Sequence, residues 1–119
     1  MERKVLFAAI LWSIGITVLS FIPMKKTDLI AINFEVNDKL VHFIFYFVLV
    51  LLWSFSQRIT SKATILKVYF FALFYGTIIE VLQPRLSPSR SSDWFDILAN
   101  FFGGTTAFLI VLIVKKSKN

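Results

Sequence analysis

Apolar positions in this 119-residue chain fall into four long runs separated by short, more polar links. The runs cover residues 5–22, 40–56, 65–82 and 94–114. Each is close to the roughly 17 to 25 residues that an α-helix needs to cross a bilayer. The pattern therefore predicts an all-α membrane protein whose four transmembrane helices pack as a small antiparallel bundle, with residues 1–119 forming a single transmembrane domain.

The first apolar run follows Glu2, Arg3 and Lys4, an arrangement that also begins secretory signal peptides. The run is longer than the apolar core of a typical signal peptide, and no Ala-x-Ala cleavage site follows it. We therefore expect this segment to be retained as the first helix.

Polar residues interrupt three of the runs, and they do so at helical spacing. Residues three or four positions apart lie on one face of a helix, so each set predicts a polar stripe. Because neighbouring helices are antiparallel, the three stripes are expected at the same membrane surface, where they would form a shallow polar pocket. The residues concerned are Asp38, Lys39, His42 and Tyr46 in the second helix, Gly76, Glu80 and Gln83 in the third, and Asp93, Asp96, Asn100, Gly103 and Gly104 in the fourth.

The ionisable members of these stripes are expected to face the interior of the bundle. Exposing a charged side chain to lipid costs about 2.5 to 3.5 kcal/mol at the centre of a bilayer. His42, Glu80 and Asp96 therefore need partners within the protein, and the cations closest in sequence are Lys39, Arg85 and Arg90. Glycines remove side chains where helix backbones approach closely, which is the expected role of Gly76, Gly103 and Gly104.

Composition supports a membrane location. Hydrophobic residues make up 57% of the chain, and the mean hydropathy is +0.76. The formal net charge of +6 comes from residues at the ends of the apolar runs, not from one face of an amphipathic helix, which argues against nucleic acid as a partner. The absence of cysteine excludes thiolate metal sites, cysteine nucleophiles and cysteine lipidation.

The distribution of basic residues predicts an orientation. With four spans, the two termini and the middle link share one side of the membrane, and that side holds eight lysines and arginines against five on the other. Loops rich in lysine and arginine remain in the cytoplasm. Both termini are therefore expected there, with the polar pocket near the extracytoplasmic surface.

Three motifs occur in order along the chain: Asp38-Lys39-x-x-His42-Phe43-x-x-Tyr46, then Glu80-x-x-Gln83, then Arg90 followed by Asp93, Asp96, Asn100 and Gly103. Together they resemble the VanZ-like family of small bacterial membrane proteins, named for a teicoplanin-resistance protein. The resemblance covers roughly residues 5 to 112, and the chain departs from the family pattern in carrying Ala107 where many members place a second glycine. It implies a multi-pass, four-helix protein of the bacterial plasma membrane, with tolerance to teicoplanin or other lipoglycopeptides for some members.

Simpler structural roles compete with a functional site at several of these positions. Asp93 and Asp96 have the spacing of a helix capping box, and His42 suits a buried hydrogen-bonding residue as well as a base or a metal ligand. A metal site of His42, Glu80 and Asp96 is chemically permissible, but no HExxH or other spacing fixes it. We therefore predict no metal ligand and no cofactor. Packing or interfacial anchoring is expected of Tyr46, Trp12, Trp53 and Trp94.

Two functions from different classes remain open, besides a purely structural role for the polar residues as hydrogen bonds that join the helices. The first is binding of a membrane lipid or a lipid-linked anionic amphiphile. Its ligand-binding residues would be Asp38, Lys39, His42, Tyr46, Glu80, Gln83, Arg90, Asp93, Asp96 and Asn100. The second is an intramembrane hydrolase or transferase acting on a lipid-linked substrate, with His42 or Glu80 as general base and Asp38 or Asp96 orienting it. The oligomeric state is open.

Overall fold

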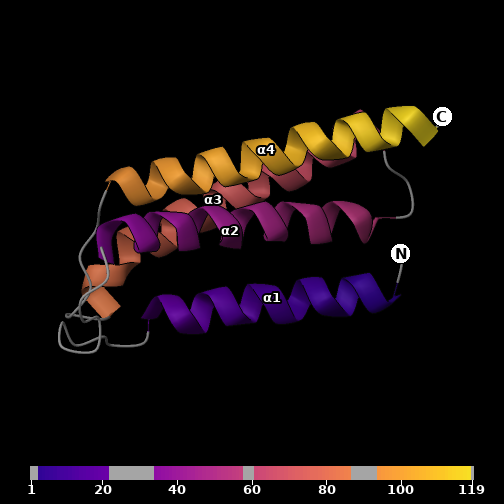
Figure 1. The fold of residues 1–119 in the computed structure, drawn as a ribbon. Helices are drawn as coiled ribbons and strands as arrows, with labels where there is room; N and C mark the ends of the chain where they lie inside the picture. The colour runs from indigo at the N-terminus through magenta and orange to yellow at the C-terminus, as the bar shows by residue number, and fades with distance from the viewer. Residues whose placement is uncertain (1–2, 22–33, 58–60, 87–93, 119) are drawn as a thin grey trace.

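The computed structural model describes residues 3–21, 34–57, 61–86 and 94–118, and it describes side chains at 3–21, 39–57, 61–85 and 94–114. Within these ranges the chain forms no strand and four helices: α1 (Arg3–Phe21), α2 (Phe34–Phe55), α3 (Lys62–Leu86) and α4 (Trp94–Lys118). The predicted all-α bundle of four helices is confirmed. Figure 1 shows the N-terminal end of α1 and the C-terminal end of α4 at the same end of the bundle.

Several helix ends differ from those predicted. The second helix begins at Phe34 instead of residue 40, the third covers Lys62–Leu86 instead of 65–82, and the fourth extends to Lys118. Polar residues continue a helix beyond its apolar run, so the runs underestimate the helices. Pro84, which lies two residues beyond the third apolar run, belongs to the last turn of α3. Proline has no backbone N–H, so it cannot donate the helical hydrogen bond to the carbonyl four residues earlier. This loss is tolerated in the last turn, because α3 ends two residues later.

Three helices are long and apolar enough to cross a membrane: Arg3–Phe21, Lys62–Arg85 and Trp94–Val114. At about 1.5 Å per residue, a helix of the length of α1 extends roughly 28 Å, which matches the approximately 30 Å of hydrocarbon in a bilayer. The described apolar part of α2, Lys39–Phe55, is shorter, and α2 lies between α1 and α4 in the bundle (Figure 1).

Large apolar side chains are exposed on the outside of the bundle, and several polar and charged side chains are buried inside it. In a water-soluble protein the charged residues are almost always at the surface. Here His42, Glu80 and Asp96 are buried. Many large apolar or aromatic residues are exposed, among them Phe7, Phe71, Phe74, Phe95, Trp94 and Ile113. This distribution is the one expected of a protein surrounded by lipid, where polar groups must find partners within the bundle.

The most extensive contact between two helices is that of α2 with α4. Gly103 of α4 lies against the backbone of Phe43, where an added Cβ would be 2.9 Å from the Phe43 carbonyl carbon. At Gly104 an added Cβ would lie 3.6 Å from the nearest side-chain atoms, an ordinary contact. The close approach of these two helices therefore depends on Gly103 and does not require Gly104.

Hydrogen bonds attach α1 to α2 and α3. The Trp12 indole Nε1 donates to the Phe45 carbonyl at 2.8 Å, and the Trp53 Nε1 donates to the Ser13 hydroxyl at 3.0 Å. The Tyr75 hydroxyl of α3 donates to the Ser13 carbonyl at 3.1 Å and also contacts the Thr17 hydroxyl. Trp12 and Trp53 therefore join helices inside the bundle.

Candidate functional site

The polar ends of three helices meet at one end of the bundle. Figure 1 shows the start of α2, the end of α3 and the start of α4 at the same end, as their antiparallel order predicts. His42 of α2, Glu80 of α3 and Asp96 of α4 each offer one ligand atom, and these atoms lie within 4.8 Å of one another. We call Lys39, His42, Glu80, Asp96 and Asn100 the polar cluster.

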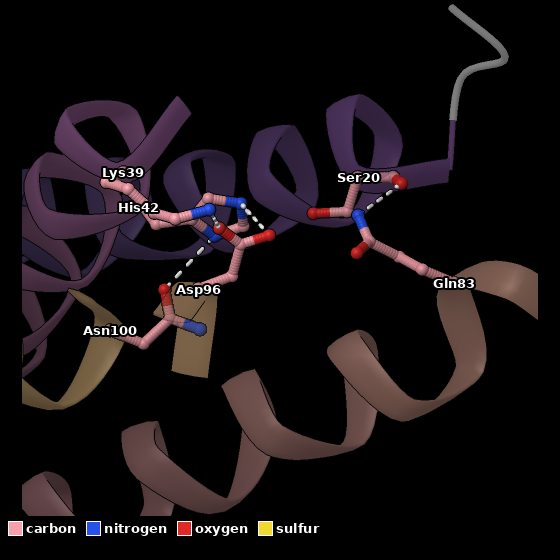
Figure 2. A network of polar contacts seen from close by, with 6 residues as sticks. All are labelled: Ser20, Lys39, His42, Gln83, Asp96 and Asn100. Atoms are coloured by element: carbon pink, nitrogen blue, oxygen red, sulfur yellow. Dashed lines mark hydrogen bonds and ion pairs between the residues drawn. The ribbon is translucent and has the colours of Figure 1, made fainter. Parts of the chain in front are cut away.

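An ion pair forms the rim of the polar cluster. The Lys39 ammonium donates to Asp96 Oδ1 at 2.7 Å (Figure 2). The Lys39 side chain is 28% exposed, whereas that of Asp96 is 6% exposed. The ammonium therefore neutralises a buried carboxylate from the surface side of the cluster.

His42 lies deeper and connects α2 to α4 through both ring nitrogens. Its Nδ1 is 3.1 Å from the side-chain oxygen of Asn100, and its Nε2 is 3.6 Å from Asp96 Oδ2 (Figure 2). An amide oxygen only accepts, so Nδ1 is the donor in this pair. In the neutral ring, Nε2 is then an acceptor, and it faces the Asp96 carboxylate, which is also an acceptor. The contact of Nε2 with Asp96 is favourable when a proton or another cation lies between the two atoms.

Gly76 allows α3 to come close enough for Glu80 to join the cluster. An added Cβ at Gly76 would lie 2.9 Å from the Tyr46 ring and 3.1 Å from Asn100 Nδ2. The Tyr46 ring and the Asn100 amide thus occupy the space that a side chain would take. Glu80 is one helical turn further along α3 and is almost completely buried.

Gln83 turns toward α1 instead of the polar cluster. Its side-chain Nε2 donates to the backbone carbonyl of Ser20 at 2.8 Å, and both residues are buried. In Figure 2 this pair lies apart from the group around His42. Ser20 is not among the residues predicted for the site, and no sequence pattern indicates it, because every residue carries a backbone carbonyl.

Three predicted site residues lie outside the described part of the chain: the side chain of Asp38, and Arg90 and Asp93 entirely. Tyr46 is buried against Gly76 and belongs to the packing below the cluster. The structure brings together Lys39, His42, Glu80, Asp96 and Asn100 from the predicted set.

The cluster combines two carboxylates with one ammonium and one imidazole. Such a set can hold a proton or a metal cation between the imidazole and the carboxylates. Its part-exposed ammonium can also meet an anionic group that approaches from the membrane surface. The arrangement therefore supports binding or acid–base chemistry at one end of the bundle.

Comparison with known proteins identifies relatives of this chain. An uncharacterised protein of the fission yeast Schizosaccharomyces pombe is 33% identical over 119 residues, which cover 98% of this chain and 68% of the yeast protein. This relative is eukaryotic, so the resemblance to bacterial proteins does not by itself indicate a bacterial source. No solved structure matches the chain. The VanZ/LLP1 family matches residues 4–115, and the chain belongs to that family.

Proposed function

We propose that this protein binds the polar headgroup of a membrane lipid or of a lipid-linked anionic amphiphile at the polar cluster. The observation that carries the proposal is the ion pair of Lys39 with Asp96, in which a part-exposed ammonium is held at 2.7 Å from a buried carboxylate. Ionisable residues inside membrane segments are costly, and their presence is a default indication of a functional site.

Two described cations at the same end of the bundle support the choice of an anionic headgroup. Lys39 lies near the start of α2, and Arg85 is exposed in the last turn of α3. Ammonium and guanidinium groups both bind phosphate through charge-assisted hydrogen bonds. Arg90, which follows α3 in the sequence, would add a third cation on this proposal.

Apolar residues beside the cluster supply a surface for the tails of such a ligand. Leu40 and Val41 follow Lys39 on α2, and Phe95 and Leu98 flank Asp96 on α4; all four are exposed. Acyl chains would lie along this surface while the headgroup meets the cations. A lipoglycopeptide such as teicoplanin, which carries a lipid tail, falls within this ligand class. The positive-inside distribution of basic residues favours an extracytoplasmic location for the site.

Binding of purified protein to lipids tests the proposal. Protein in nanodiscs or detergent is titrated with zwitterionic and with anionic phospholipid, and bound lipid is counted by native mass spectrometry. Losing the hydrogen bond of the Lys39 ammonium to the headgroup costs about 1 kcal/mol, so Lys39→Ala is expected to lower the preference for anionic lipid about fivefold.

Two further variants make the test specific. Lys62→Ala removes an exposed cation at the start of α3, at the opposite end of the bundle, and should leave the preference unchanged. Lys39→Arg keeps the charge and should restore the preference. Equal anionic preference in wild type, Lys39→Ala and Lys62→Ala would contradict the proposal.

A second candidate function is intramembrane hydrolysis or group transfer on a lipid-linked substrate. The contact of His42 Nδ1 with Asn100 at 3.1 Å favours it, because this contact leaves Nε2 as the proton acceptor on the side of Asp96. Purified protein should then convert a phospholipid or a polyprenyl phosphate, and His42→Gln should abolish turnover while binding persists. If all of these lipids bind and none is converted, the enzymatic function is wrong.

A further inference from the structure

We propose that His42, Glu80 and Asp96 form a binding site for one divalent transition-metal cation, of the class of Zn²⁺ or Mn²⁺. The inference goes beyond the proposed headgroup binding and does not depend on it. It also revises the expectation from the sequence, where no spacing of histidine and acids fixed a metal site.

The distances between the donor atoms suit a shared cation. The three ligand atoms come from three different helices and lie within 4.8 Å of one another. His42 Nε2 and Asp96 Oδ2 are 3.6 Å apart. Donors bound tetrahedrally to zinc at 2.0 to 2.1 Å are about 3.3 Å apart, so the pair of His42 and Asp96 needs to close by a few tenths of an ångström and the widest pair by at most about 1.5 Å.

The orientation of His42 is that of a metal ligand. In metal sites the ring nitrogen that does not bind the metal usually donates to a carbonyl or carboxylate, which fixes the tautomer. Asn100 supplies such an oxygen at 3.1 Å from Nδ1. The lone pair of Nε2 is then directed toward the side of Asp96, where a cation would meet both. Asn100 is therefore a positioning residue in this proposal.

Burial and charge also favour a cation. His42 is 8% exposed, Glu80 1% and Asp96 4%. With a neutral imidazole, the two carboxylates and the Lys39 ammonium give the five side chains of the polar cluster one net negative charge, so a cation placed between the carboxylates is attracted to the cluster. Lys39 holds Asp96 Oδ1 and leaves Oδ2 on the side of His42, so both cations would share one carboxylate and would repel each other. Lys39 is thus expected to weaken metal binding.

The donor types select the class of metal. Imidazole nitrogen suits zinc, copper, iron and nickel, and the two carboxylates also suit manganese, whereas magnesium and calcium prefer sites made of oxygen. The chain has no cysteine, so no thiolate contributes to the site. The remaining coordination positions would be filled by water or by an oxygen of a ligand.

Metal binding by the full-length protein tests the proposal. Protein without a purification tag is treated with a chelator, loaded with Co²⁺ or Zn²⁺ and desalted, and the bound metal is counted by mass spectrometry. Wild type should retain about one ion per chain, and bound Co²⁺ should give visible absorption bands. His42→Gln, Glu80→Gln and Asp96→Asn should each lose the ion, and Asn100→Ala should weaken binding by about 10-fold to 100-fold.

Lys39→Met keeps the test decisive if the other variants fold poorly. It removes the ammonium that would repel the metal at Asp96, so metal affinity should rise, a result that misfolding does not produce. Ser54→Ala, a buried hydroxyl in the other half of α2, is the matched control and should bind metal as wild type does. If wild type retains no more metal than His42→Gln, the metal-site proposal is wrong. The headgroup proposal is tested separately, and it stands if the protein keeps its preference for anionic lipid in the presence of chelator.

Discussion

Gly103 of α4 lies directly against the backbone carbonyl group of Phe43 of α2. This contact determines how closely the two helices approach, because no side chain separates their backbones. One turn before Phe43 lies Lys39, and His42 immediately precedes Phe43; on the other helix Asn100 and Asp96 are one and two turns before Gly103. The approach that Gly103 permits is therefore the one that brings the two halves of the polar cluster into hydrogen-bonding distance.

Replacing Gly103 by alanine is expected to destabilise the bundle. The new Cβ would lie 2.9 Å from the Phe43 carbonyl carbon, which belongs to a backbone that cannot rotate away. Inserting a methyl group into a tightly packed contact costs about 1 to 3 kcal/mol. Thermal unfolding in detergent, followed by circular dichroism, should show a lower midpoint for Gly103→Ala.

Gly15→Ala is the matched control for this substitution. An added Cβ at Gly15 of α1 meets nothing within 4 Å. Alanine is favoured over glycine inside a helix by about 0.5 to 1 kcal/mol, so this variant should melt at or slightly above the wild-type temperature. Equal midpoints for Gly103→Ala and Gly15→Ala would show that the contact with Phe43 is not restrictive.

The pair of His42 and Asn100 should be energetically coupled. Removing Asn100 leaves a buried imidazole N–H without the acceptor now 3.1 Å away, which costs about 1 to 3 kcal/mol. A double-mutant cycle of His42→Ala and Asn100→Ala is expected to give an interaction free energy of about 1 kcal/mol or more. Chemical unfolding of the four proteins measures it, and strictly additive effects would argue against the hydrogen bond.

The sequence predicted which residues meet, because helical spacing and antiparallel order are enough to bring His42, Glu80 and Asp96 to one end of the bundle. It did not predict how each helix is rotated about its axis. That rotation depends on packing, such as Gly103 against Phe43 and Tyr46 against Gly76. The sequence therefore did not predict that Lys39 pairs with Asp96. Nor did it predict that Gln83 faces α1 and donates to the Ser20 carbonyl.

Gln83 is expected to contribute to stability through α1. Gln83→Leu removes the 2.8 Å hydrogen bond to the Ser20 carbonyl and should lower the free energy of unfolding by about 0.5 to 1.5 kcal/mol. Thr77→Val is the control, because the exposed Thr77 hydroxyl donates only within its own helix, to the Leu73 carbonyl. Anionic lipid preference should stay unchanged in Gln83→Leu. A large loss of lipid binding at unchanged stability would instead assign Gln83 to the ligand site.

The orientation of the bundle can be measured with single cysteines, because the natural chain contains none. Ser87→Cys lies in the sequence between α3 and α4, and Thr60→Cys between α2 and α3. If the basic middle link is cytoplasmic, a membrane-impermeant maleimide should label Ser87→Cys in intact cells and Thr60→Cys only after permeabilisation. The reverse pattern would put the polar cluster at the cytoplasmic surface. Labelling of both cysteines in intact cells would mean that α3 does not cross the membrane, which its length and hydropathy contradict.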